Sequence, residues 1–222
     1  MRKVALTVSL IGLWLAGCST TPPRVAPPPA ITKTATVKAV QGPFQPDANL
    51  YLCPSSTVTN AFEADPNNRI LNFNPIVLVD GKVVLTPVPM NNACMTSGFG
   101  KRSGRVHKGL DVKARPGSQI YSAAPGIIRE ADYSTGFGNY IVIDHGQGIF
   151  TRYAHMSGFS PGIHQGMSIG FGQPLGLIGQ SGNATGIHLH FEVLTGNYNT
   201  PKRSFGLTAR DPLSFPPYAG AG

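Results

Sequence analysis

The spacing of glycine through the second half of the chain restricts the fold. Twenty of the 27 glycines lie between Gly98 and Gly196, where they separate short apolar runs. Glycine favours tight turns and weakens helices, so this spacing predicts an antiparallel all-β domain. Short apolar runs bounded by turn residues are the candidate strands. They are residues 120–123, 126–131, 140–144, 150–155, 174–178 and 188–194.

A separate hairpin is expected before this domain. Residues 76–79 and 82–85 are apolar except for Lys82 and rich in valine and isoleucine, and Asp80-Gly81 stands between them. An Asp-Gly pair supplies the positive φ angles of a type I′ turn, which joins two antiparallel strands tightly. We expect residues 47–95 to form a small N-terminal subdomain that carries this hairpin.

The N-terminus has the composition of an export signal. Arg2 and Lys3 precede an apolar run that ends in Leu15-Ala16-Gly17-Cys18. A charged start, a short apolar stretch and small residues before a cleavage site are typical of a secretory signal peptide. The ending resembles the bacterial lipobox, which implies cleavage after Gly17 and a lipid on Cys18. Ser19 after the cysteine favours the outer membrane, with the protein facing the periplasm.

The remaining chain divides by composition. Residues 19–46 contain seven of the 20 prolines, which indicates a semi-extended tether. The predicted organisation is a signal peptide (1–17), the tether (18–46), the N-terminal subdomain (47–95), the main domain (96–217) and a tail (218–222).

Charge and cysteine content fit the cell envelope. The formal charge of +8 falls to +6 without Arg2 and Lys3. For an exported basic protein, anionic cell-wall polymers and lipids are expected partners, and nucleic acid is not. With Cys18 lipidated, Cys53 and Cys94 remain as an even pair, so we expect a disulfide in an oxidising compartment.

Two groups of metal-ligating residues stand out. The first is His107-Lys108-Gly109-Leu110-Asp111, and the second is His188-Leu189-His190-Phe191-Glu192. On a strand, His188 and His190 point to one face while Leu189 and Phe191 point to the other. Because Gly104 and Gly109 oppose a helix, the first group is expected to form an extended turn. Two imidazoles and a carboxylate suit zinc, in a catalytic site or in a closed structural one.

The ordered set of motifs resembles peptidase family M23, the lysostaphin-type or LytM-type zinc metallopeptidases. It comprises His107-x-Gly109-x-Asp111, then Tyr153-Ala154-His155-Met156, then the group at 188–192. The likeness covers about residues 96–213. It implies the LytM-type β-sheet core, and zinc ligation by His107, Asp111 and His190. It also implies catalytic roles for His155 and His188, without saying which one is the general base.

This resemblance implies hydrolysis of peptide cross-links in peptidoglycan, with D-Ala–diaminopimelate bonds as the expected target. Zinc lowers the pKa of bound water to about 7, and a nearby histidine accepts the water proton. Glu192 is expected to hydrogen-bond a ligand, His145 to be structural and His164 to be exposed. The basic residues around the first motif form either a solvated rim or a surface that captures the anionic wall. They are Lys101, Arg102, Arg105, Lys108, Lys113 and Arg115.

Two other functions compete with this one. Some LytM-type domains lack metal ligands and activate other wall hydrolases, but all five expected positions are present here. In other family members, an N-terminal segment supplies an asparagine side chain that binds the zinc. The candidates here are Asn60, Asn67, Asn68, Asn72 and Asn74. Ile187 stands where many members carry proline, and we expect no loss of zinc binding from it.

Overall fold

The computed structural model describes residues 44–54, 56–102, 104–199 and 201–220, all within one compact unit. The expected signal peptide, Cys18 and residues 18–43 of the tether lie outside the described residues. Among the described residues, no helix is both long and apolar enough to cross a membrane.

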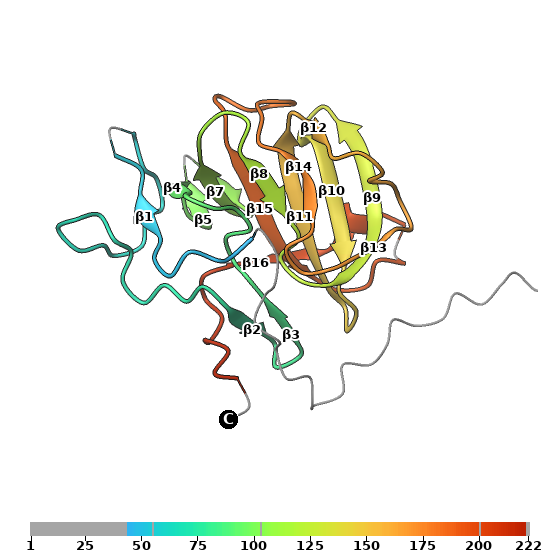
Figure 1. Cartoon of the computed structure of the whole chain (residues 1–222), viewed down its shortest axis with the longest axis horizontal. Coiled ribbons are helices and arrows are strands. Elements are labelled where there is room, and N and C mark those ends of the chain that lie inside the picture. Colours follow the sequence, from blue (N-terminus) through green and yellow to red (C-terminus); the bar gives the residue numbers. More distant parts are fainter. Residues whose placement is uncertain (1–43, 55, 103, 200, 221–222) are drawn as a thin grey trace, which may run out of the picture. The chain divides into compact units, whose positions relative to one another are not determined.

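One large sheet dominates the molecule (Figure 1). Its strand pairs are antiparallel, except that β1 runs parallel to β4. The expected all-β class is therefore confirmed, with one parallel pair added. In spatial order the strands are β1 (Tyr51–Leu52), β4 (Cys94–Ser97), β7 (Leu110–Lys113), β15 (Leu189–Thr195), β11 (Ile149–Met156), β10 (Gly138–Asp144), β9 (Gly126–Ser134) and β13 (Ser168–Ile169), with β16 (Thr208–Arg210) paired to β15.

In the described part of the chain, three smaller sheets accompany it, together with one 3₁₀ turn, η1 (Arg203–Gly206). The first contains β12 (Gly158–Phe159), β14 (Pro174–Leu177) and β8 (Gln119–Tyr121). The second is the hairpin of β2 (Val77–Val79) and β3 (Val83–Leu85), and the third is the hairpin of β5 (Gly100–Arg102) and β6 (Arg105–His107).

The core lies between the large sheet and the elements that cover its apolar face. Leu189, Phe191 and Val193 alternate along β15 and are fully buried in this core. The hydroxyl of Tyr153 accepts a hydrogen bond of 2.8 Å from the backbone N–H of Ala123, so this buried tyrosine is not left with an unpaired polar atom. The alternation directs His190 and Glu192 to the opposite face, where the polar site forms.

The Asp-Gly hairpin forms as predicted. Asp80 and Gly81 have φ angles of 48° and 69°, and the amide of Lys82 donates to Val79 O at 2.9 Å. The C-terminal segment joins this hairpin, because Val77 forms an antiparallel bridge with Pro217. The hairpin therefore has a strand neighbour from the other end of the chain.

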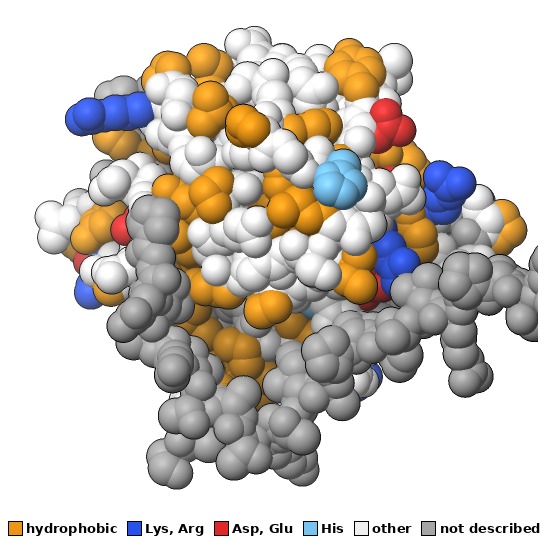
Figure 2. All heavy atoms as spheres, turned by 45° about the vertical axis from the view of Figure 1, so that its right-hand side comes forward, with side chains coloured by type: hydrophobic (Ala, Val, Ile, Leu, Met, Phe, Trp, Pro, Cys, Tyr) orange, Lys and Arg blue, Asp and Glu red, His pale blue; other side chains and the backbone are white. Residues whose placement is uncertain are grey.

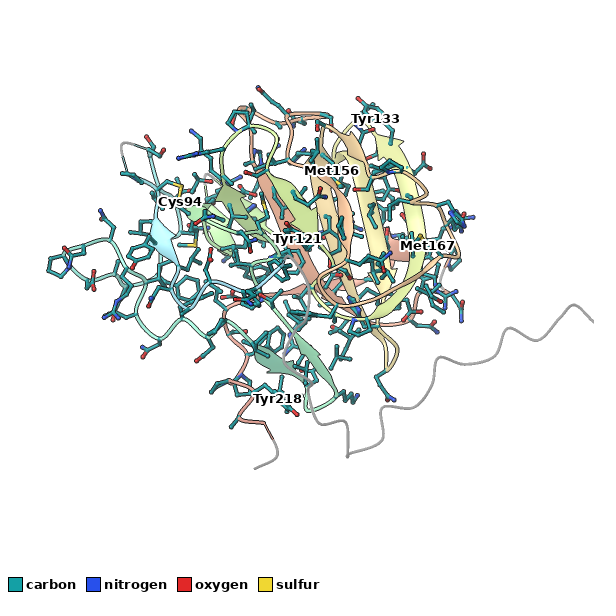
Figure 3. All side chains as sticks on the ribbon, in the orientation of Figure 1. Cys94, Tyr121, Tyr133, Met156, Met167 and Tyr218 are labelled. Carbon is teal, nitrogen blue, oxygen red and sulfur yellow. A yellow bond between two sulfur atoms is a disulfide. The ribbon has the colours of Figure 1, made fainter. Side chains whose placement is uncertain are left out.

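The segment before the metal motifs is joined to the large sheet directly. β1 pairs with β4, and a disulfide links Cys53 to Cys94 with a Cα–Cα distance of 4.8 Å. Figure 3 shows its sulfur atoms at Cys94, beside β1 and β4. The disulfide fixes this segment at the edge of the large sheet, beside β4, the strand that precedes the first motif.

The extended turn expected around 107–111 contains two strand ends. β6 ends at His107 and β7 begins at Leu110, so only Lys108 and Gly109 connect them.

The face of the molecule shown in Figure 2 is a mixture of apolar and uncharged polar surface, with its few charged side chains towards the edges.

Candidate metal centre

Three neighbouring strands of the large sheet bring the predicted site residues together. In the register of β7, β15 and β11, Asp111 lies opposite His190, and His190 lies opposite Ala154. His155 follows Ala154 directly, while His107 enters from the end of β6. Residues separated by up to 83 positions in sequence therefore meet on one face of the sheet.

His107, Asp111 and His190 form a compact set of possible metal ligands. Their donor atoms lie within 4.8 Å of one another, and all three residues are buried. His107 Nε2 lies 3.1 Å from Asp111 Oδ1 and 3.1 Å from His190 Nδ1, and the latter two atoms are 2.8 Å apart. Within the described residues, this is the group that meets the geometric requirement for a metal ion.

Hydrogen bonds orient the two histidine ligands. His107 Nδ1 donates to Gly98 O at 2.7 Å, which leaves Nε2 facing Asp111. His190 Nδ1 faces the cluster, and its Nε2 lies 3.1 Å from Glu192 Oε1. Such outer partners fix the ring tautomer and increase the basicity of the nitrogen that binds metal.

The electrostatics of the cluster favour positive charge. Burial alone would raise the pKa of Asp111, but hydrogen bonds from His107 and His190 hold that pKa far below its usual range. Burial likewise opposes protonation of His190, yet Asp111 and Glu192 raise its pKa to about 9. A carboxylate and two imidazoles that stabilise a cation are a suitable environment for a metal ion.

His155 and His188 lie beside the cluster with their ring centroids 4.8 Å apart. His155 Nδ1 bonds Ser181 O at 2.9 Å, and His188 Nδ1 bonds Gly186 O at 2.8 Å. His188 Nε2 is 3.7 Å from Asp111 Oδ1. His155 has a φ of 62°, a left-handed conformation that is rare for histidine in a strand and typical of functional sites. Burial lowers the pKa of His155 to about 4, so the ring is neutral at pH 7.

Glu192 is held by a buried arginine that the sequence did not single out. Arg152 Nη1 donates to Glu192 Oε2 at 2.6 Å, and both side chains are almost completely buried. The guanidinium also lies over the ring of Phe137, with its central carbon 4.2 Å from the centroid. The nearby positive charges of His190 and Arg152 lower the pKa of Glu192 against the effect of burial. Arg152 therefore keeps Glu192 ionised and facing His190.

A second arginine, Arg102, supports the site from the β5–β6 hairpin. Its Nη1 donates to Ser97 Oγ at 2.7 Å and lies 3.6 Å from Asp111 Oδ2. In the sequence, Arg102 is one of several basic residues around the first motif. The contact between Arg102 and Asp111 depends on how the β5–β6 hairpin packs beside the large sheet. The composition of the hairpin does not predict this packing.

The remaining histidines lie apart from the cluster. His145 is buried, with Nδ1 bonded to Pro125 O at 2.7 Å and Nε2 at 2.8 Å from Thr151 Oγ1. These two contacts give it the structural role that was expected. His164 is exposed, as expected, and its Nδ1 bonds Gly162 O at 2.7 Å.

One of the candidate N-terminal asparagines lies near the site. Thr59 bridges Ser97, and the backbone oxygen of Asn60 packs against Gly98, whose carbonyl binds His107. The side-chain amide of Asn74 donates to Asn72 O, and the backbone N–H of Asn67 donates to Asp65 Oδ1. Asn60 is therefore the candidate whose backbone supports the metal cluster.

Fold and site together define a mainly antiparallel β-sheet domain that carries a candidate metal centre. Residues 105–201 match the model of peptidase family M23.

Two curated relatives share this region. The chain is 36% identical over 111 residues to the DD-carboxypeptidase/endopeptidase Mpg of Neisseria meningitidis, covering 47% of this chain and 25% of Mpg. It is 36% identical over 121 residues to the peptidoglycan DD-endopeptidase ShyB of Vibrio cholerae, covering 50% and 27%. The matched part thus spans about a quarter of each relative.

Among solved structures, a zinc-containing peptidase from Vibrio cholerae superimposes with a TM-score of 0.53 at 27% identity. The likeness covers 64% of this chain and 46% of that one. It agrees with the fold, and that protein is described as a zinc-containing peptidase.

Proposed function

We propose that this protein is a zinc endopeptidase that hydrolyses peptide cross-links of bacterial peptidoglycan, with D-Ala–diaminopimelate bonds as its target. The observation that carries the proposal is the convergence of His107, Asp111 and His190 within 4.8 Å, with His155 and His188 beside them. The relatives named as peptidoglycan endopeptidases support the substrate class.

The donor set fits zinc. Two imidazole nitrogens and one carboxylate oxygen are the three-ligand pattern of catalytic zinc sites, which keep a fourth position for water. His107 Nε2, Asp111 Oδ1 and His190 Nδ1 would hold the ion. When bound, zinc lowers the pKa of water to about 7 and polarises a carbonyl group.

His155 and His188 handle protons in this proposal. Each ring donates its Nδ1 proton to a backbone carbonyl, so in the neutral ring Nε2 is a proton acceptor. One Nε2 accepts the proton of the attacking water and passes it to the leaving amine, which typically contributes 10²–10⁴-fold to the rate. The other ring, when protonated, donates a hydrogen bond to the developing oxyanion.

The proposed location is the cell envelope. A lipid on Cys18 would anchor the chain to the outer membrane facing the periplasm, and the Cys53–Cys94 disulfide supports an oxidising compartment. Mass spectrometry of the mature N-terminus tests the anchor. An unacylated N-terminus would exclude it.

The function is tested with residues 19–222, made without the lipid, loaded with zinc and mixed with purified peptidoglycan sacculi. The expected result is loss of cross-linked muropeptide dimers, blocked by a chelator and reduced at least about 100-fold in His188→Ala. His164→Ala is the matched control, because His164 is an exposed histidine in a loop, and it should retain full activity.

Mass spectrometry of the released fragments identifies the bond that is cut. If the protein binds stoichiometric zinc but releases no fragment, the proposal is wrong, and a role in activating other wall hydrolases becomes the better account. Failure to bind zinc would contradict the assignment of the three ligands.

A further inference from the structure

A hollow of about 360 Å³ adjoins the proposed metal ligands. One wall is the β5–β6 hairpin with the residue that follows it, which contribute Arg102, Arg105 and Lys108. The other side is formed by Phe137, and His107 and His190 lie at its inner end. The two catalytic candidates, His155 and His188, are not among the residues that line it.

The hollow is positively charged. Arg105 and Lys108 are exposed, and within the described part of the chain neither forms an ion pair. Arg102 is 40% exposed and lies near Asp111, but its short hydrogen bond is to Ser97. Two unpaired cations and a partly exposed third therefore surround one cavity.

The acidic residue in the lining does not cancel this charge. Glu192 directs one carboxylate oxygen to Arg152 at 2.6 Å and the other to His190 at 3.1 Å. Glu192 is buried and its ion-pair contacts are with Arg152 and His190, while Lys108 acts on it only as a nearby charge that lowers its pKa. An incoming anion meets the guanidinium and ammonium groups.

We propose that this basic pocket binds a carboxylate of the peptide substrate while the neighbouring peptide bond lies at His107 and His190. This inference rests on the proposed function and narrows the substrate to peptides that carry a free carboxylate close to the bond that is cut. Arginine binds carboxylates through parallel hydrogen bonds, and lysine adds a point charge. Phe137 offers an apolar surface to the carbon chain that bears the carboxylate.

The diaminopimelate residue of the stem peptide has this chemistry, since it combines a carbon chain with free carboxylates. A pocket of this kind acts mainly on substrate binding, because the carboxylate keeps its charge throughout the reaction. Loss of one charged hydrogen bond at a partly exposed position should therefore raise KM about 10-fold and leave kcat nearly unchanged.

The test compares two cross-linked peptides, one with free diaminopimelate carboxylates and one with these groups amidated. The mature zinc-loaded chain should cleave the free form with a kcat/KM about 10-fold higher than the amidated form. In Arg105→Gln this preference should fall towards one, through KM, with little change on the amidated peptide. Arg115→Gln is the matched control, because Arg115 is an exposed arginine outside the pocket, and it should keep the preference.

Several outcomes overturn the inference. One is equal cleavage of both peptides by the unmodified chain, and another is an equal loss on both peptides in Arg105→Gln. The variant Lys108→Gln provides a second test of the same preference, and its zinc content shows whether the neighbouring His107 is undisturbed.

Failure of the proposed function would give a different pattern. If neither peptide is cleaved, calorimetric binding of the two peptides to zinc-loaded His188→Ala still tests the pocket. Tighter binding of the free-carboxylate peptide, lost when Arg105→Gln is added, would support the inference. Equal binding of both peptides would refute it.

Discussion

At the scale of single residues, His145 links the stability of the fold to pH. Its imidazole is fully enclosed, and burial lowers its pKa from the ordinary 6.5 to about 4. Its two ring nitrogens are occupied by Pro125 O and Thr151 Oγ1. Folding therefore favours the neutral ring.

This environment predicts a stability change in mildly acidic solution. Between pH 6.5 and 4 the unfolded chain binds a proton at His145 that the folded chain does not, so the free energy of unfolding falls as the pH falls. The contribution reaches about 3 kcal/mol near pH 4. His145→Gln should remove this part of the pH dependence, as measured by chemical denaturation at several pH values.

His164→Gln is the control for that experiment, because His164 is exposed. It should reproduce the pH profile of the unmodified chain. A His145→Gln profile parallel to that of the unmodified chain would contradict the assignment of the effect to His145.

At the scale of elements, the junction of β6 and β7 positions one ligand on each side of Gly109. A Cβ at this position would contact the backbone oxygen of Phe191 and lie 2.9 Å from Cε1 of His190. β7 could then no longer approach β15 at its present distance. Glycine is required here by close packing between strands rather than by a positive φ.

Gly109→Ala should therefore damage both stability and metal binding. We expect the free energy of unfolding to fall by about 1–3 kcal/mol, as for other insertions into packed regions, and the affinity for zinc to fall at least about 10-fold. Thermal unfolding and competition with a chromophoric chelator measure the two effects. Gly158→Ala, where no atom lies within 4 Å of the added carbon, should change neither. A normal zinc affinity in Gly109→Ala would show that β7 can shift without cost.

The strands differ in how well the sequence pattern predicts them. Six candidate strands correspond to β8, β9, β10, β11, β14 and β15, because each has an apolar run bounded by turn residues. β5, β6 and β7 lack such runs, because each is only three or four residues long and contains charged side chains, so their pairing follows only from tertiary contacts. The two-residue strands β12 and β13 are too short to leave a pattern.

The same contrast holds within the site. The two metal-ligating motifs have recognisable spacing, and these residues lie together in the structure. Arg152 is different, because its only visible property in the sequence is one positive charge on an apolar strand. Its partner Glu192 is 40 positions away, and the ion pair depends on the register of β11 with β15.

At the scale of the whole molecule, the disulfide connects two segments that are 41 positions apart. A cross-link over this length restricts the unfolded chain and contributes about 4 kcal/mol in the chain-entropy description. It joins the edge strand β1 to β4, while the metal ligands lie on β7, β15 and the end of β6.

Removing the disulfide should therefore weaken the fold more than the metal site. Cys53→Ser/Cys94→Ser is expected to lower the free energy of unfolding by about 2–4 kcal/mol while retaining stoichiometric zinc at 25 °C. Denaturant unfolding and metal analysis of the same samples provide the measurements. Reduction of the unmodified chain should give a similar loss of unfolding free energy. An unfolding midpoint that does not change when reductant is added would contradict this account.

The position of β15 between β7 and β11 has a consequence for the timing of assembly. A chain is synthesised from its N-terminus, so β7 and β11 emerge well before the strand that must lie between them. His190 arrives with that late strand, so His107 and Asp111 lack the third ligand until it does. The complete ligand set therefore arises only after β15 has been made and has inserted between its two neighbours. A nascent chain that lacks β15 carries no complete set of metal ligands.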